Sequence, residues 1–264
     1  MGHAYLMPEM ILLFFLFAFG SIVGSFLNVC IVRIPEKISV VFPASHCISC
    51  KKAISWHDNI PLLSYLVLGG KCRLCKAPIA FRYFVVELLT SLVMLVLYMY
   101  YGWSLLLPVT FVFSAALIVI TFIDLRHQII PDVISLPGIP LCFVCSFIVP
   151  WTDPLQSLIG IAAGGGVLYV FAAGYQLLTN KEGMGGGDIK LLAMIGAFLG
   201  WKGALAALML GAFAGSMTGI ILIFAKGKSL KYAVPFGPFL AAGAFCALLY
   251  GEKLYTWYVS LGKL

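Results

Sequence analysis

The stretch KEGMGGGDIKLLAMIGAFLG, residues 181–200, places one acid, Asp188, after three consecutive glycines and at the start of an apolar run. An exposed turn does not need so many glycines, and a membrane helix rarely carries a carboxylate at its edge. Similar apolar runs recur along the chain, and several reach the roughly 20 residues that a helix needs to cross a bilayer. The stretch therefore indicates a helical membrane protein in which Asp188 has a function.

The composition of the whole chain supports the same class of protein. Of its 264 residues, 62% are hydrophobic and only 10% are charged, and the mean hydropathy is +1.06. A soluble domain of this size would not stay dissolved with so little polar surface. The first apolar run, residues 10–32, follows no basic segment and precedes no small-residue cleavage site, so we predict a retained helix rather than a secretory signal.

We therefore predict an all-α polytopic membrane protein with about eight transmembrane helices. The expected spans are residues 10–32, 84–101, 104–123, 130–149, 155–178, 188–200, 204–225 and 235–250. Three glycines inside the fifth span, residues 164–166, are expected to permit close packing against a neighbouring helix.

Eight spans divide the connecting loops into two sets, and the basic residues are distributed very unequally between them. Fourteen lysines and arginines fall on one side, and only Lys202, Lys253 and Lys263 fall on the other. Cytoplasmic loops carry the excess of positive charge in membrane proteins, so the first set is predicted to be cytoplasmic. This topology signal also accounts for the net charge of +7 without a nucleic-acid partner.

Two CxxC pairs lie in the long connection after the first span. Cys47 and Cys50 form the first pair, and Cys72 and Cys75 form the second, with twenty-one residues between the pairs. Two such turns can bring four thiolates around a tetrahedral zinc ion. The predicted cytoplasmic side argues against disulfides, because thiols there are kept reduced. A structural zinc site is thus favoured over unmetallated thiols, and it would stabilise a loop too small for a large core.

Asp124 and Asp188 are predicted to act as a pair. A carboxylate at membrane depth is usually functional, and both acids are expected at the cytoplasmic surface on different spans. Each also has a structural alternative. Asp188 could cap the helix that follows it, and Asp124 could form an interface ion pair with Arg126.

Other polar residues near the spans have less specific interpretations. Asp132 fits an acid that stabilises a helix start. Lys190 could tune the neighbouring acid or bind a substrate. Glu87 could pair with Arg82 or bind an incoming amine, and Asn28 could have a packing or an interface role.

These motifs resemble those of the type IV prepilin peptidases, a family of membrane aspartyl proteases. GMGGGDIK (183–190) contains the GxGD signature, and DLRHQIIPD (124–132) is similar to the companion motif. Three further blocks are similar to that family: GSFLNVCIVRIP (24–35), NIPLLSYLVLGGKCRLCKAPIAFRYFVVELLT (59–90) and PFGPFLAAGA (235–244). The resemblance covers most of the chain, and family members commonly carry the paired CxxC loop.

The resemblance implies a two-step enzyme of the bacterial inner membrane with its active site at the cytoplasmic face. The first step cleaves the basic leader of type IV prepilins or type II secretion pseudopilins between Gly and Phe. The second step methylates the new N-terminus with S-adenosylmethionine. Asp124 and Asp188 would be the catalytic pair, one carboxylate activating water while a protonated partner polarises the carbonyl. The implied partners are these substrates and membrane lipid, and no nucleic acid.

The resemblance also implies three parts of the chain. Residues 1–32 would form the first transmembrane helix, residues 33–83 a cytoplasmic zinc-binding loop associated with methyl transfer, and residues 84–264 the membrane protease domain. No glycine-rich turn of the dinucleotide-binding type is present to indicate the S-adenosylmethionine site, so no residues are assigned to it.

Helix dipoles give an expectation for the proton shared by the two acids. Asp188 at a helix start is expected to be the carboxylate, and Asp124 at a helix end the protonated acid. Two other classes of function stay open at this point. One is a GxGD protease without methyltransferase activity, such as a preflagellin peptidase, and the other is a non-enzymatic transporter or scaffold that uses its acids for ion coupling.

Overall fold

The computed structural model describes residues 6–179, 185–226 and 234–261. Within these ranges the regular elements are helices and no β-strand occurs, which confirms the all-α prediction. The helices are α1 (Leu6–Arg33), η1 (Trp56–Asn59), α2 (Leu63–Val67), α3 (Arg82–Tyr101), α4 (Leu106–His127), α5 (Asp132–Cys145), α6 (Pro154–Thr179), α7 (Gly186–Lys226) and α8 (Gly237–Leu261).

Five helices in the described part of the chain are long and apolar enough to cross a membrane. They are Glu9–Arg33, Arg82–Tyr101, Leu106–His127, Pro154–Thr179 and Gly186–Phe224. The helix α5 has 14 residues, and the apolar stretch Gly237–Gly251 at the start of α8 is also shorter than the ~20 residues of a full span. The chain is thus a membrane protein by composition and helix length, and the expected number of eight spans is not confirmed.

The spans expected at 188–200 and 204–225 form a single element, α7, with a break in its middle. The backbone of Gly200 is non-helical, with φ 70° and ψ 177°. Glycine adopts this conformation without the penalty that a Cβ would bring. A Cβ at this position would also lie 2.8 Å from Oγ1 of Thr152. The helix therefore changes course where the sequence predicts a connection.

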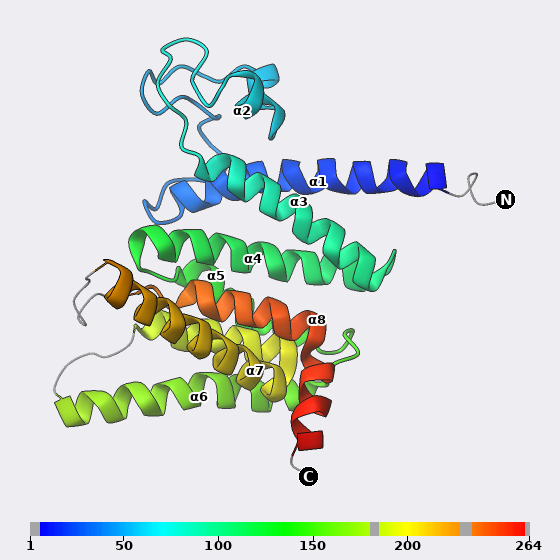
Figure 1. Cartoon of the computed structure of the whole chain (residues 1–264), viewed down its shortest axis with the longest axis vertical. Helices are drawn as coiled ribbons and strands as arrows, with labels where there is room; N and C mark the ends of the chain where they lie inside the picture. The colour runs from blue at the N-terminus through cyan, green and yellow to red at the C-terminus, as the bar shows by residue number, and fades with distance from the viewer. Residues whose placement is uncertain (1–5, 180–184, 227–233, 262–264) are drawn as a thin grey trace. The chain divides into compact units, whose positions relative to one another are not determined.

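The chain forms two compact units, Met1–Val119 and Ile120–Leu264, and α4 contributes to both. In the first unit, α1 packs on α3 (Figure 1), and the connection between them carries η1 and α2. The two helix backbones meet closely at Gly20 and Gly24, where an added Cβ would lie 2.7 Å from the Cα atoms of Ser91 and Glu87, respectively. Small residues spaced in this way permit close helix contact in membranes.

In the second unit, α7 packs against α5, α6 and α8 (Figure 1). Residues 191–200 of α7 are all buried. The Ser157 hydroxyl on α6 donates to the Ala197 carbonyl at 2.6 Å, and the Trp151 indole donates to the Phe198 carbonyl at 3.0 Å. Gly164 lies against the Leu192 backbone, as the glycines of this helix led us to expect. The buried half of α7 therefore holds its N-terminal turn, which carries Asp188, in a fixed place.

Candidate active site and zinc centre

Asp124 lies in the last turn of α4, where its side chain is buried. Its Oδ2 accepts a hydrogen bond of 2.9 Å from the backbone N–H of Gly237, the first residue of α8. A Cβ on Gly237 would lie only 2.7 Å from this same oxygen. The absence of a side chain at Gly237 thus allows the start of α8 to approach the carboxyl group.

Asp188 lies in the first turn of α7 and is half-buried. Its backbone N–H donates to the Gly185 carbonyl at 3.1 Å, which closes the glycine turn. A Cβ on Gly187 would lie 2.8 Å from Cβ of Ile130, a residue of the segment that follows Asp124. The two motifs therefore touch through this glycine; Gly183 and Met184 of the quoted stretch lie outside the described residues.

The two carboxyl groups are close enough to interact electrostatically. They come from the end of α4 and the start of α7, and both belong to the second unit. Two nearby carboxyl groups rarely ionise together, so such a pair tends to hold one proton between them. One member can then accept a proton while the other donates one, which is the requirement for hydrolysis by general acid–base catalysis.

The other polar groups near this pair form separate contacts. Nζ of Lys190 lies 2.7 Å from Oδ1 of Asp132, so this ion pair joins the first turns of α7 and α5. Arg126 and His127 are exposed, and none of the ion pairs among the described residues includes either. Lys190, for which the sequence left tuning of Asp188 or substrate binding open, thus forms an ion pair with Asp132.

The four cysteines of the first unit meet in a cluster. The Sγ atoms of Cys47, Cys50, Cys72 and Cys75 all lie within 4.8 Å of one another. Those of Cys47 and Cys75 are 3.7 Å apart, close to the ~3.8 Å that two sulfurs would keep at zinc–sulfur bonds of about 2.3 Å in a tetrahedron. Neither neighbouring histidine, His46 or His57, belongs to the cluster. The donor set and spacing fit a zinc ion.

The two CxxC turns have nearly the same backbone. In each turn the residue after the second cysteine, Lys51 or Lys76, has a left-handed φ of 57° or 58°. The amide of this lysine donates to the carbonyl of the first cysteine, at 2.8 Å for Cys47 and 3.0 Å for Cys72. This arrangement turns both thiols of a pair toward the same side, so that two pairs can share one metal ion.

The polypeptide also prepares the thiols to bind a cation. Backbone hydrogen bonds, chiefly from Cys50, lower the pKa of the Cys47 thiol to about 6. Backbone hydrogen bonds from Cys75 and Leu74 likewise lower the pKa of the Cys72 thiol. The Ala77 backbone lowers the pKa of Cys75, but loss of water contact and the neighbouring cysteines outweigh it and raise that pKa to about 11. Two thiols are thus readily available as thiolates, the form that binds metal.

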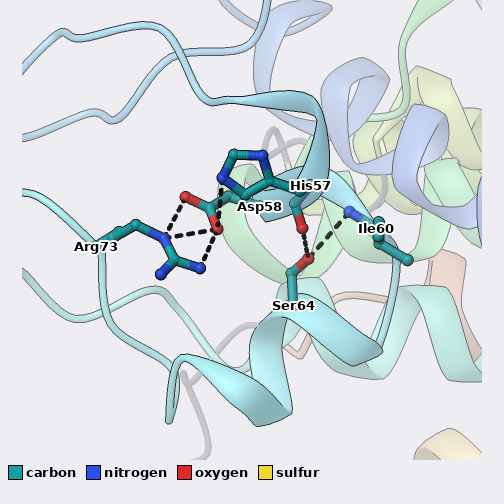
Figure 2. Close-up of polar contacts among 5 residues, drawn as sticks. All are labelled: His57, Asp58, Ile60, Ser64 and Arg73. Carbon is teal, nitrogen blue, oxygen red and sulfur yellow. Dashed lines mark hydrogen bonds and ion pairs between the residues drawn. The ribbon is translucent and has the colours of Figure 1, made fainter.

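A second set of polar contacts fastens the CxxC turn at Cys72 to η1, as Figure 2 shows. The Arg73 guanidinium binds the Asp58 carboxylate through both Nε and Nη2, at 2.9 and 2.6 Å. This contact holds the pKa of Asp58 below its usual range. The Ser64 hydroxyl accepts from the Ile60 amide at 3.0 Å and donates to the His57 carbonyl at 3.1 Å, which ties η1 to α2.

Glu87 accepts a backbone hydrogen bond that the sequence did not suggest. Its Oε2 accepts the backbone N–H of Leu62 at 2.8 Å, in a buried position. None of the ion pairs in the described residues joins it to Arg82. Leu62 has a left-handed φ of 61°, a rare conformation for a residue with a side chain. Leu62 and Glu87 are 25 residues apart, so no local sequence pattern indicates this hydrogen bond. The bond holds the connection at Leu62 against α3.

Two protein-family descriptions match the chain, one in each half. Residues 18–101 match the bacterial peptidase A24 N-terminal domain, and residues 111–223 match the type IV leader peptidase family. The second match contains Asp124 and Asp188, and the first contains the four clustered cysteines.

Several curated proteins are similar over nearly the whole chain. Proteins named prepilin leader peptidase/N-methyltransferase from Aeromonas salmonicida and Pseudomonas putida are 38% and 35% identical to it. The alignments cover 92% and 90% of both partners, respectively. The protein of that name from Legionella pneumophila is 32% identical over 91% of this chain and 92% of its own length. No solved structure matches significantly.

Proposed function

Because the chain belongs to the type IV leader peptidase family, we propose that it cleaves the leader from type IV prepilins or pseudopilins and methylates the new N-terminus. The meeting of Asp124 and Asp188 beside a glycine turn carries the peptidase half of this proposal. The relatives named N-methyltransferase support the second activity. They disfavour a protease that lacks this activity, and also a scaffold that uses its acids only for ion coupling.

In the proposed cleavage step, one carboxylate removes a proton from water while the protonated acid polarises the scissile carbonyl. The acid then supplies the proton that the leaving amine needs, and no covalent intermediate forms. We assign the carboxylate to Asp124 and the proton to Asp188. The Gly237 amide at the start of α8 donates to Asp124, and both the hydrogen bond and the helix start favour a negative charge there. This contact reverses the assignment expected from α4 and α7 alone.

We propose a structural zinc ion held by Cys47, Cys50, Cys72 and Cys75, and S-adenosylmethionine as the methyl donor. The sulfur spacing, close to that of a tetrahedral site, supports the metal, and the relatives named N-methyltransferase support the donor. The zinc would link the two CxxC turns, and the Asp58–Arg73 contact supports the same link.

We further propose an inner-membrane location with the two acids at the cytoplasmic face, as the distribution of basic residues predicts. In this arrangement the kinked α7, the 14-residue α5 and α8 would complete the eight passages expected from the sequence. The three-part division at residues 32 and 83 also remains a proposal, with the methyl-transfer half on the N-terminal side.

One experiment tests both activities. The purified protein is incubated with a prepilin peptide, with and without S-adenosylmethionine, and the masses of the products are measured by mass spectrometry. We expect cleavage after Gly in both samples and a gain of one methyl group only when the donor is present. An intact peptide would contradict the peptidase, while a cleaved product without methylation would contradict the second activity alone.

A further inference from the structure

The first unit contains a cavity of about 460 Å³ between α1, α3 and the connection that joins them. This volume lies within the roughly 300–1,000 Å³ typical of small-molecule sites. Three of the clustered cysteines line one part of it, and Asn28 and Glu87 line another. The cavity lies within residues 25–87, so the N-terminal half of the chain builds it without residues from the second unit.

Glu87 brings a buried carboxyl group to this cavity. Its side chain is 8% exposed, and it is held by the Leu62 amide and by an interaction with the Ser25 side chain. None of the ion pairs found in the described ranges includes Glu87. A buried carboxylate without a cationic partner is unfavourable, so the cavity is suited to a ligand that carries positive charge.

Asn28 adds an unsatisfied acceptor to the same region. Its amide nitrogen donates to the Tyr83 carbonyl at 3.0 Å, which fixes the orientation of the side chain. The amide oxygen is then buried without a hydrogen-bond partner in the part of the chain that is described, and Asn28 is only 1% exposed. Tyr83 is one helical turn before Glu87 on α3. The Tyr83 carbonyl that binds Asn28 and the Glu87 carboxyl group therefore lie on neighbouring turns of α3, where this helix packs against α1.

Two of the cations that line the cavity are engaged by other groups, and a third, Lys52, is exposed. The Arg33 guanidinium donates to the carbonyls of Ser39 and Pro43 at 2.9 and 2.7 Å, and Arg73 is bound to Asp58. The rest of the lining is largely apolar and includes the ring of Tyr65, a surface suited to a flat heterocycle. The cavity therefore combines an anionic, acceptor-rich corner with an apolar wall.

We propose that this cavity binds S-adenosylmethionine, with the Glu87 carboxylate and the Asn28 oxygen beside its sulfonium centre and the apolar wall against its adenine. The proposal rests on the methyltransferase activity proposed above. When bound, the donor supplies a methyl group: a C–N bond forms to the peptide amine, the C–S bond breaks with its electron pair on sulfur, and the amine loses a proton. Because the spent product is a neutral thioether, Glu87 favours the donor over the product.

The test compares binding of S-adenosylmethionine and S-adenosylhomocysteine to the full-length protein in detergent. The second compound keeps the amino acid and adenosine groups but lacks the positive sulfur. In Glu87→Gln the amide oxygen can still accept the Leu62 N–H while the charge is lost. We expect this variant to bind the donor roughly 10- to 100-fold more weakly, as for a lost charged contact, and to bind the thioether within about threefold of normal. Glu36→Gln, an exposed site outside the cavity, is the matched control and should change neither affinity.

Three results would overturn the assignment. Unchanged affinity for both compounds would remove Glu87 from the site, and an equal loss for both would give it a purely structural role. Displacement of the donor by a peptide with a free N-terminal phenylalanine would assign the anionic corner to the amine instead. If the wild-type protein bound neither compound, the proposed methyltransferase function itself would fail, and this outcome is distinct from the other three.

A second measurement uses the unaltered protein, so it does not depend on a variant that folds. Radiolabelled S-adenosylmethionine is cross-linked to the protein by ultraviolet light, and the labelled peptide is identified. We expect the label within residues 25–87, which contain the whole lining of the cavity. A label found only outside this range would overturn the proposal.

Discussion

The Gly237 amide has the largest effect of any single residue contact on the proposed peptidase chemistry. It brings an N–H donor from the start of α8 to a carboxyl group 113 residues earlier in the chain. Without this donor, the helix ends alone would place the negative charge on Asp188. The contact instead assigns it to Asp124, and it leaves Asp188 to hold the shared proton.

Replacing either acid with an amide should stop cleavage. Asp124→Asn removes the group that takes the water proton, and Asp188→Asn removes the group that donates one. Loss of a general acid or base typically costs about 10²- to 10⁴-fold in rate. The measurement is cleavage of a prepilin peptide by protein that still accumulates in the membrane. Asp132→Asn, which alters only the ion pair with Lys190, is the matched control and should cleave at a near-normal rate. Near-normal cleavage by either of the first two variants would exclude that residue from the mechanism.

The location of the shared proton can be read by infrared spectroscopy of the two variants. We expect a protonated-acid band near neutral pH that disappears in Asp188→Asn. A pH–rate profile alone would not assign the proton, because coupled acids titrate as a unit. A band that instead persists in Asp188→Asn and disappears in Asp124→Asn would restore the assignment based on α4 and α7.

At the scale of the elements, glycines set the distances between segments that carry the chemistry. A Cβ on Gly237 would meet the Asp124 carboxyl group, so Gly237→Ala should displace either α8 or the acid. A displacement of about 1 Å at a reactive group can cost roughly 10²-fold in rate. Gly174→Ala on α6 makes the same change at a position where the added Cβ would meet nothing within 4 Å beyond the backbone of its own helix, and cleavage by this control should be unaffected. Equal rates for the two variants would show that the close approach of α8 is not needed.

The cluster of four cysteines, proposed above as a zinc site, lies in the connection between α1 and α3. In zinc-finger peptides the metal contributes about 10–16 kcal/mol of folding free energy at neutral pH. Cys47→Ser or removal of the metal by a chelator should therefore unfold much of residues 40–80. Hydrogen exchange and metal analysis measure the two effects, with Cys145→Ser in α5 as the control. The absence of zinc from freshly purified protein would contradict the proposed site.

At the scale of the whole molecule, the two proposed activities lie in different units of the chain. The clustered cysteines and the cavity belong to Met1–Val119, and both aspartates belong to Ile120–Leu264. We expect Cys47→Ser to lose methylation while it keeps cleavage. Asp188→Asn should show the opposite pattern and methylate a peptide that already begins with phenylalanine. Mass spectrometry measures both products, and loss of both activities in both variants would contradict this separation.

Hydropathy and turn residues in the sequence are sufficient to predict the long helices, but not η1 and α2. Each expected span coincides with a helix or with part of one, because apolar runs and their Gly, Pro and basic ends are local features. The break at Gly200 could not be distinguished from a loop, since both interrupt the helical pattern in the same way. The predicted number of eight spans was not confirmed, because the length of a short helix such as α5 depends on how it packs against its neighbours.

The site was predictable only in part. The motifs identify Asp124, Asp188 and the four cysteines, whose roles are still predictions. Contacts that join distant segments leave no local pattern, and the Lys190–Asp132 pair, the Gly237 donor and the Leu62–Glu87 bond are of this kind. The sequence likewise gives no sign that the Asn28 amide oxygen is buried without a hydrogen-bond donor, because this depends on which groups surround it in the fold.

The close contact of α1 and α3 has a consequence for engineering. Asn28 binds the Tyr83 carbonyl, and Gly24 touches the backbone of Glu87, so the chain leaves α1 and enters α3 at neighbouring points. The intervening segment is thus an insertion whose two stems are already held together by the helices. Residues 34–81 could be replaced by a short linker with little strain on the helix pair, and a foreign domain with adjacent termini could be placed in the same position. The adjacent ends of α1 and α3 would be the points of exchange. The excised segment would keep the four cysteines that we propose to bind zinc, so it could be transferred to another protein together with its metal site.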